Sequence, residues 1–162
     1  MRKPYLIMMT VVLVLLISAC GNKNSAEPVY EPSMTTKEMV DSVTSKYEQP
    51  ALVELTAEDI STLYHLDPQL LDQYTIMMPM MNIKTNEIAV MKVKDSKDIP
   101  AVEDAVKQRA TDIQKQFENY LPDQYENAKN YKLTTNGNFV IFIISEKADE
   151  LEKAFSDLFV KP

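Results

Sequence analysis

Apolar residues recur every three or four positions through the middle of the chain, which is the spacing of one face of an α-helix. The longest such series runs from Ile99 to Tyr120 and contains Ile99, Val102, Val106, Ala110, Ile113, Phe117 and Tyr120. Pro122 then interrupts the period, because proline lacks the amide hydrogen that a helix interior requires. The pattern predicts an amphipathic helix of about 22 residues.

Shorter helices are predicted on both sides of this one. Thr35 and Glu38 have the spacing of a capping box, in which each side chain satisfies a free backbone amide of the first helical turn. A second helix is expected to open at Thr56, and a short third one at Asp67, where Pro68 suits the first helical position. Ser145 is expected to cap a last helix, whose apolar stripe consists of Ala148, Leu151, Phe155, Leu158 and Phe159.

Two pairs of extended segments separate the helices. Residues 74–81 and 87–93 form the first predicted hairpin, and residues 131–135 and 138–144 form the second. Asn136-Gly137 lies between the last two segments, and both residues tolerate a positive φ, which favours a type I′ turn. Residues 139–144 are apolar on both faces, which is typical of a central strand that is covered on each side.

The order of these elements predicts the fold class. We expect an α+β domain with a four-stranded antiparallel or mixed sheet, built from the two hairpins and packed with the long amphipathic helix and the C-terminal helix. The domain is expected to span residues 34–162. A chain of this length can bury a substantial core within one domain.

The first 19 residues have the pattern of a secretory leader. Arg2 and Lys3 precede a nearly continuous apolar run over residues 6–17, which is shorter than the roughly 20 residues of a membrane span. Ile17-Ser18-Ala19-Cys20 resembles the lipobox of bacterial lipoproteins. The resemblance implies that diacylglycerol is attached to the Cys20 sulfur and that residues 1–19 are then removed. A plain signal peptide with an accidental cysteine is the alternative.

Residues 20–33 are predicted to form a lipidated tether. The segment after Cys20 is rich in Asn, Ser, Pro and Glu and has no apolar period, so its composition favours disorder. We therefore expect the protein to be held on the extracytoplasmic face of the cell membrane through lipid on Cys20, with the membrane as its first partner.

The charge and the cysteine content exclude further classes of partner and of chemistry. The chain has 17 basic and 24 acidic residues, which argues against nucleic acid as a partner and against electrostatic adhesion to anionic lipid. Cys20 is the only cysteine, so its acylation leaves no thiol for a disulfide, a zinc–thiolate site or a nucleophile.

The sequence shows no recognisable reaction centre. Only two glycines are present, Gly21 and Gly137, whereas phosphate-binding loops need several. The single histidine, His65, is expected near a helix end, where a cation is favourable. Neighbouring carboxylates such as Glu103-Asp104 and Asp149-Glu150 fall on predicted helix surfaces. We expect no catalytic residue, no cofactor and no metal ligand.

Residues 77–81 place four methionines around Pro79. Thioether sulfur suits copper(I), but strand alternation points Met78 and Met80 to one side and Met77 and Met81 to the other, so three sulfurs would converge only after a sharp bend at Pro79. Lining of a core or groove is the favoured interpretation. Pro79 also indicates an edge strand or a bulge, and such an edge offers a partner strand a place to pair.

Glu87 and Arg109 are the most informative charged positions. Glu87 begins an extended segment, and Arg109 lies near the apolar stripe of the long helix, between Val106 and Ile113. A bidentate, partly desolvated pair is expected, with a structural role as the favoured interpretation. The functional alternative is a binding site in which Arg109 holds an anionic ligand, with Glu87, Tyr120 and Tyr125 nearby.

Several segments together resemble an uncharacterised family. These are residues 80–90, Arg109, residues 120–125 and residues 136–140, and the similarity covers about Thr56 to Phe155. The family consists of lipid-anchored proteins of Gram-positive bacteria that carry a domain of unknown function. The resemblance implies a surface lipoprotein and no activity, cofactor or catalytic residue.

Two functions remain open from the sequence. The first is a membrane-anchored, non-enzymatic module that binds an envelope protein, a peptide or a small ligand. The second is an envelope hydrolase or transferase that uses carboxylate and tyrosine side chains. The second requires two carboxyl groups that face one cleft with pKa values driven apart.

Overall fold

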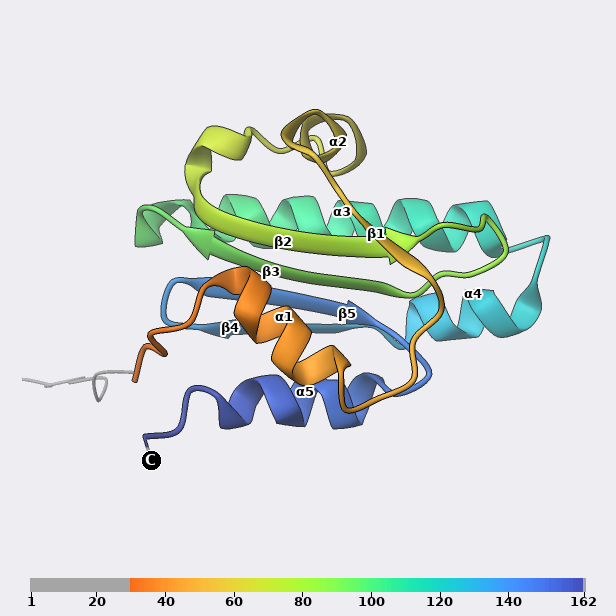
Figure 1. Ribbon diagram of the computed structural model, residues 1–162. Helices are drawn as coiled ribbons and strands as arrows, with labels where there is room; N and C mark the ends of the chain where they lie inside the picture. Colours follow the sequence, from red (N-terminus) through yellow and green to blue (C-terminus); the bar gives the residue numbers. More distant parts are fainter. Residues whose placement is uncertain (1–29, 162) are drawn as a thin grey trace, which may run out of the picture.

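A sheet between two layers of helices makes up the part of the chain that the computed structural model describes, residues 30–161 (Figure 1). The predicted leader, Cys20 and most of the predicted tether lie outside the described residues. The predicted α+β class is confirmed, as is the packing of the sheet against a long central helix and a C-terminal helix.

The sheet has five strands rather than the predicted four. Their order is β1-β2-β3-β5-β4, and every neighbouring pair is antiparallel. The strand bounds are β1 Leu52–Glu54, β2 Leu71–Pro79, β3 Glu87–Val93, β4 Lys132–Asn136 and β5 Phe139–Ile144. All six residues of β5 are buried and the strand lies between β3 and β4, so the prediction of a central strand covered on both faces is confirmed.

β1 is the strand that the sequence analysis missed. It has three residues, which pair with the end of β2 from Leu52 opposite Pro79 to Glu54 opposite Met77. Three residues are too few to show an alternating pattern, and none of them is fully buried. The position of β1 therefore depends on β2 rather than on a signal in its own sequence.

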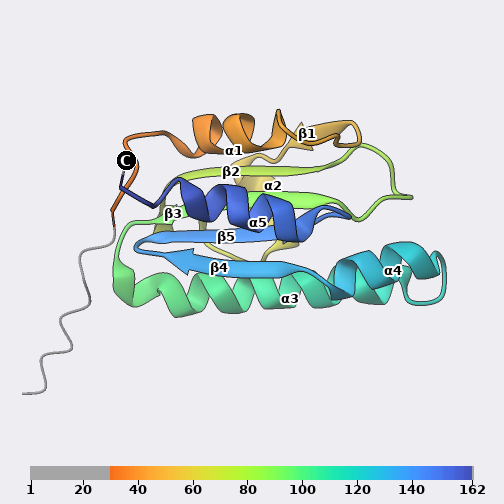
Figure 2. The ribbon, with the colours of Figure 1, turned by 90° about the horizontal axis from the view of Figure 1, so that it is seen from below.

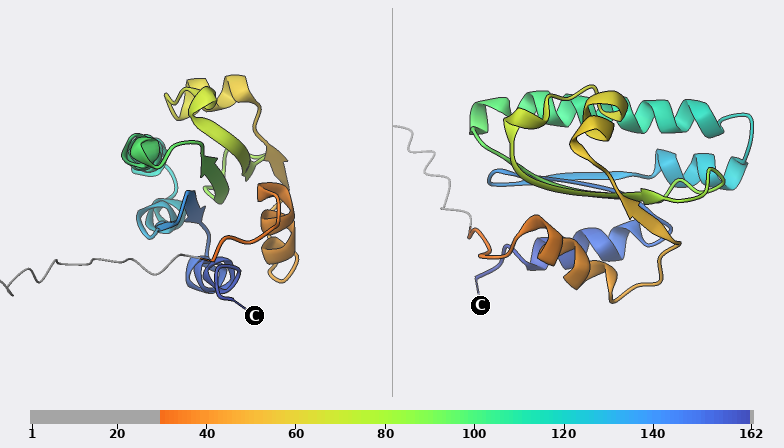
Figure 3. Two further views of the ribbon diagram at one scale, coloured as in Figure 1. Left: turned by 90° about the vertical axis from the view of Figure 1, so that its left-hand side faces the viewer. Right: turned by 45° about the horizontal axis from the view of Figure 1, so that its top comes forward.

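Helices cover both faces of the sheet (Figure 3). On one face lie α2 (Ala57–Leu63) and α3 (Ile99–Phe117), and α4 (Pro122–Lys129) follows α3. On the other face lie α1 (Thr36–Thr44) and α5 (Ala148–Asp157). Short 3₁₀ turns over Pro68–Leu70 and Ser96–Asp98 precede β2 and α3.

Five of the seven residues of the predicted stripe form the buried face of α3, which has 19 residues and ends at Phe117, before Tyr120. Val102, Val106, Ala110, Ile113 and Phe117 are all buried in the core between α3 and the sheet. The second core lies on the opposite face, where α1 and α5 pack on β3 and β5. β3 alternates between the two cores, with Ile88 and Val90 in one and Ala89, Met91 and Val93 in the other.

Two helices begin at the capping residues that the sequence predicted, and a third does not. Thr35 and Glu38 form the predicted capping box of α1, and Thr56 and Asp59 form another at α2. Ser145 was expected to cap the last helix, but α5 begins at Ala148 with no side-chain cap, and the Ser145 hydroxyl instead accepts a hydrogen bond from the Lys147 amide.

The β4–β5 hairpin is present, but its turn lies one residue later than predicted. Asn136 pairs with Phe139, so the turn residues are Gly137 and Asn138. Gly137 has a φ of 57°, whereas Asn138 is not among the residues with positive φ. Positive φ at the first turn residue alone is the pattern of a type II′ turn, which has glycine at that place, and not of type I′.

Between residues 30 and 161, no helix is both long and apolar enough to cross a membrane.

Candidate functional site

The site begins with an ion pair between the first residue of β3 and the middle of α3. The Arg109 Nε and Nη2 atoms donate hydrogen bonds of 3.0 and 2.6 Å to the two carboxylate oxygens of Glu87. The Glu87 side chain is 1% exposed and that of Arg109 is 11% exposed. The predicted bidentate pair is thus confirmed, and it is more deeply buried than the sequence indicated.

Tyr64 completes the pair and was missed by the sequence analysis. It is the C-terminal cap of α2, it is fully buried, and its hydroxyl donates a 2.5 Å hydrogen bond to Glu87 Oε1. The Arg109 guanidinium carbon also lies 5.8 Å from the centre of the Tyr64 ring. The sequence offered one indication of this role, because a tyrosine on the buried face of a helix needs a hydrogen-bond partner for its hydroxyl.

Burial and charge shift the pKa values of these groups in opposing ways. Burial, followed by the Glu87 carboxylate, raises the pKa of Tyr64 well above its usual range. For Arg109, burial favours the neutral form, but hydrogen bonds and Coulombic attraction from Glu87 outweigh it and the pKa of Arg109 is raised. Tyr64 therefore remains a hydrogen-bond donor and Arg109 remains a cation.

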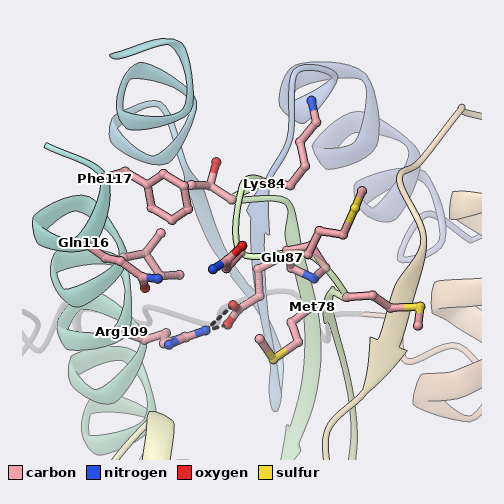
Figure 4. A pocket seen from close by; sticks show the side chains of 12 residues that line it. Met78, Lys84, Glu87, Arg109, Gln116 and Phe117 are labelled. Carbon is pink, nitrogen blue, oxygen red and sulfur yellow. Dashed lines mark hydrogen bonds and ion pairs between the residues drawn. The ribbon is translucent and has the colours of Figure 1, made fainter. Parts of the chain in front are cut away.

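A pocket of about 190 Å³ opens beside this pair (Figure 4). Arg109, Gln116 and Phe117 line it from α3, and Met78 and Glu87 line it from the facing strands. The loop between β2 and β3 closes the remaining side with Met80, Met81 and Lys84. The pocket thus joins a buried charge pair to a wall of thioether and aromatic groups.

Three of the four methionines lie as strand alternation predicts, with Met78 and Met80 on one side and Met77 on the other, and Met81 departs from it. β2 ends at Pro79 and the chain bends there, so that Met78, Met80 and Met81 all line the pocket, while Met77 packs against the core on the opposite face. Met80 and Met81 are 64% and 53% exposed. The sequence favoured methionines that line a core or groove over methionines that bind copper. Three of the four methionines do line the groove.

Pro79 does not lie on a free strand edge. β1 pairs with β2 up to Pro79, and the Met80 amide donates a 3.0 Å hydrogen bond to the Ala51 carbonyl. The predicted place for a partner strand is therefore already occupied by the chain itself. Proline is accommodated because it is the last residue of its strand.

A buried polar network holds the β2–β3 loop against α4. The Thr85 amide donates a 3.1 Å hydrogen bond to Gln124 Oε1, and Asn127 Nδ2 donates one of 3.1 Å to the Thr85 hydroxyl. Asn86 Nδ2 donates a 2.7 Å hydrogen bond to Glu146, which also lies 3.3 Å from Lys84 Nζ. Because Thr85, Asn86 and Gln124 are buried, this network fixes one end of the loop that closes the pocket.

The two predicted tyrosines lie outside the pocket. Tyr120 is 59% exposed just beyond α3, and its ring centre is 6.3 Å from that of Phe117, which does line the pocket. Tyr125 lies on α4, packs against the core, and has the Lys129 ammonium 5.1 Å from its ring centre. Of the four predicted binding residues, the structure therefore brings only Glu87 and Arg109 together in the pocket.

The remaining candidates for chemistry lie at the surface. His65 is exposed directly after α2, with a φ of 51°. Asp104 and Asp149 lie 3.0 and 2.6 Å from the ammonium groups of Lys107 and Lys132. Within the described residues, no group of three or more His, Cys, Asp or Glu side chains is arranged to hold a metal ion.

Together, the fold and the pocket define a class of protein: a three-layered α+β domain in which a small pocket is walled by a buried ion pair, by methionines and by an aromatic ring. The chain belongs to the family of the domain of unknown function DUF4358, whose model matches residues 45–145. The match includes Glu87, Arg109 and the whole β2–β3 loop. No curated protein and no solved structure matches the chain.

Proposed function

We propose that this chain is a lipoprotein on the extracytoplasmic face of the cell membrane of a Gram-positive bacterium, and that its α+β domain binds a ligand without transforming it. The anchoring half of the proposal rests on the apolar run over residues 6–17 and on Ile17-Ser18-Ala19-Cys20. Lipid on Cys20 would then hold the domain at the membrane.

The binding half rests on one observation: the pocket between α3 and the β2–β3 loop is built around a fixed guanidinium. Arg109 has five N–H donors, and Glu87 accepts only two of them. Arg109 lines the pocket, and within residues 30–161 Glu87 is the acceptor that it binds. The pocket therefore offers a ligand preorganised donors beside apolar walls, which is the usual construction of a binding site.

The geometry favours binding over the alternative of a hydrolase or transferase. A catalytic carboxylate must be free to exchange a proton with the substrate. Both oxygens of Glu87 instead accept hydrogen bonds from Arg109, and one of them also accepts from Tyr64. Tyr64 is fully buried and its pKa is raised, so its phenol stays protonated and supplies no phenolate base.

Anchoring is tested by mass spectrometry of the chain produced in a Gram-positive host. We expect the membrane fraction to contain a chain that begins at Cys20 and carries a thioether-linked diacylglycerol. A Cys20→Ala variant serves as the control and is expected to keep its leader. A free thiol at Cys20 would contradict the proposal.

Binding is tested by recovery of partners from solubilised membranes of the same host with the full chain as bait. Gln116 is exposed and lines the mouth of the pocket, so Gln116→Trp would cover the pocket without disturbing the core. Lys115→Trp places the same ring on the adjacent exposed position, outside the pocket. We expect only Gln116→Trp to lose partners. A pocket-dependent chemical turnover that Glu87→Gln abolishes would instead establish the enzymatic alternative.

A further inference from the structure

We propose that the pocket receives one aromatic side chain, preferably a tyrosine, from a polypeptide partner. The inference rests on the proposed binding function and names the class of its ligand. Four features carry it: the size of the pocket, the chemistry of its walls, the charge balance at Arg109, and the position of the pocket relative to the tether.

The size of the pocket fits a single side chain. A cavity of roughly 150 Å³ holds one benzene molecule, and this pocket has a volume of about 190 Å³. Drug-sized ligands and cofactors occupy roughly 300 to 1,000 Å³. A phenol ring with a few further atoms therefore fills the pocket, whereas a nucleotide does not fit.

The walls favour an aromatic ring over an aliphatic chain. Met78, Met80 and Met81 contribute three thioethers, and Phe117 contributes an aromatic ring. Thioether sulfur makes favourable contacts with aromatic rings, and the unbranched methionine side chain adapts to the ring that enters. Aromatic residues are also the commonest anchors of protein interfaces, where they fill pockets on the partner.

The charge balance favours a neutral acceptor at the tip of the ring. Glu87 already neutralises Arg109, and Glu146 neutralises Lys84, the other cation that lines the pocket. A further carboxylate would therefore leave an excess negative charge in a partly buried site. The chain as a whole carries a formal charge of −7, which also repels anions. A phenol oxygen or a backbone carbonyl accepts from the remaining Arg109 donors without adding charge. This departs from the anionic ligand that the sequence suggested.

The surroundings of the pocket favour a protein over a free small molecule. Exposed apolar side chains belong to the loop that closes it and to the end of α3, namely Met80, Met81, Ile83 and Tyr120. Methionine and tyrosine are enriched in protein interfaces. A side chain that fills the pocket would bring its own backbone and neighbours onto this apolar rim.

The position of the pocket argues against the membrane as its occupant. The described chain starts at the end of the sheet opposite the β2–β3 loop (Figure 2). Near that start, Glu31 lies 2.6 Å from Lys92. Lys92 also contacts Asp72 near the start of β2, whereas the pocket lies beyond Pro79 at the end of β2. Seven residues of strand separate these ends by about 23 Å. The tether therefore enters far from the apolar rim.

The test uses the lipidated full chain in phosphatidylcholine nanodiscs, with ¹³C-labelled methionine methyl groups observed by NMR. The probe is N-acetyl-L-tyrosine amide. We expect saturable shifts of the Met78, Met80 and Met81 signals, caused by the ring current of the bound phenol. Met39 and Met91 are fully buried away from the pocket and provide reference signals that do not move.

Two variants and two competing probes make the test specific. Gln116→Trp is expected to weaken binding of the tyrosine amide by about tenfold or more, and Lys115→Trp by less than about twofold. N-acetyl-L-leucine amide and free tyrosine are expected to bind more weakly than the tyrosine amide, because the first lacks the ring and the second carries backbone charges.

Four results would overturn the proposal. These are absence of shifts with the tyrosine amide, equal effects of the two tryptophan variants, tighter binding of N-acetyl-L-glutamate than of the tyrosine amide, and broadening of the Met80 and Met81 signals by a spin-labelled lipid in the disc. The last two would assign the pocket to an anion and to the bilayer. The same tyrosine-amide titration is repeated on the chain without lipid on Cys20, so failure here is distinguishable from failure of the proposed anchoring.

Discussion

Arg109 and Glu87 meet through two parallel hydrogen bonds of 3.0 and 2.6 Å, one to each carboxylate oxygen, at the junction of α3 and β3. The pair is 22 residues apart in sequence and almost completely removed from solvent. Its burial makes each partner dependent on the other, since an unpaired buried charge is costly. The pair therefore controls both the stability of the domain and the polarity of the pocket.

Replacing Arg109 by alanine is expected to lower the free energy of unfolding by about 3 to 5 kcal/mol, because Glu87 would be left buried without its cation. Urea unfolding followed by circular dichroism measures the loss. Lys115→Ala, at an exposed position of the same helix, is expected to change stability by less than about 0.5 kcal/mol. Arg109→Lys keeps the charge but not the fork of donors, so full stability of that variant would contradict the importance of the bidentate geometry.

Tyr64→Phe removes a single hydroxyl and leaves Glu87 with one donor fewer. The expected loss is about 1.5 kcal/mol, the value typical of a buried hydrogen bond to a charged group. Urea unfolding again provides the measurement. Tyr120→Phe is the matched control, because the Tyr120 ring is 59% exposed. Equal stability of the two variants would show that the Tyr64 hydroxyl contributes nothing to the pair.

The ion pair of Glu146 with Lys84 predicts part of the acid sensitivity of the domain. Burial acts to raise the pKa of Glu146, but the hydrogen bond from Asn86, with the help of Lys84, lowers it below its usual value. The unfolded chain, whose glutamate pKa is about 4.3, then takes up the proton first as the pH falls. This contribution to stability is present above that pH and is lost as the pH falls through the lowered folded-state pKa.

Urea unfolding between about pH 3 and pH 7 tests this expectation. Glu146→Gln should show a shallower loss of stability on the acidic side than the unmodified chain. The effect is expected to be small because the Glu146 side chain is 52% exposed. Glu48→Gln is the control, since the Glu48 side chain is exposed and forms no ion pair within residues 30–161. Parallel pH curves for all three chains would contradict the prediction.

His65→Gly is expected to stabilise the domain. Among residues 30–161, His65 is the only non-glycine residue with positive φ, and it directly follows the cap of α2. Glycine adopts this conformation without the steric cost of a Cβ atom, although it is more flexible in the unfolded chain. The net gain should be about 0.5 kcal/mol, measured by thermal unfolding. His65→Ala keeps the Cβ atom and should show no such gain.

Local patterns predicted the elements of this fold well. The period of α3, the two hairpins, the capping box at Thr35 and the start of a helix at Thr56 are each encoded within a short stretch of sequence. Two of the errors occur where pairing between strands, and not the local pattern, decides the structure. β1 exists because β2 offers it an edge, and the turn at Gly137 is placed by the register of the whole β4–β5 ladder.

The candidate site was predicted only in part for the same reason. The pairing of Glu87 with Arg109 was predicted because each residue is a charge at the edge of an otherwise apolar pattern. Tyr64 was not found, because in its own helix it is one more member of the apolar stripe. Its hydroxyl becomes significant only when α2 and β3 are packed together.

The sequence by itself determined most of the segments that become helices and strands, with β1 as the exception, because amphipathic periodicity is a property of neighbouring residues. It also contains the apolar run over residues 6–17 and Cys20, on which the proposed anchoring depends. Only the tertiary structure decided the strand order, the bend after Pro79 and the convergence of Met78, Met80, Met81 and Arg109 on one pocket. These features join residues that are far apart in the chain, and only the packing of the complete core brings them within contact distance.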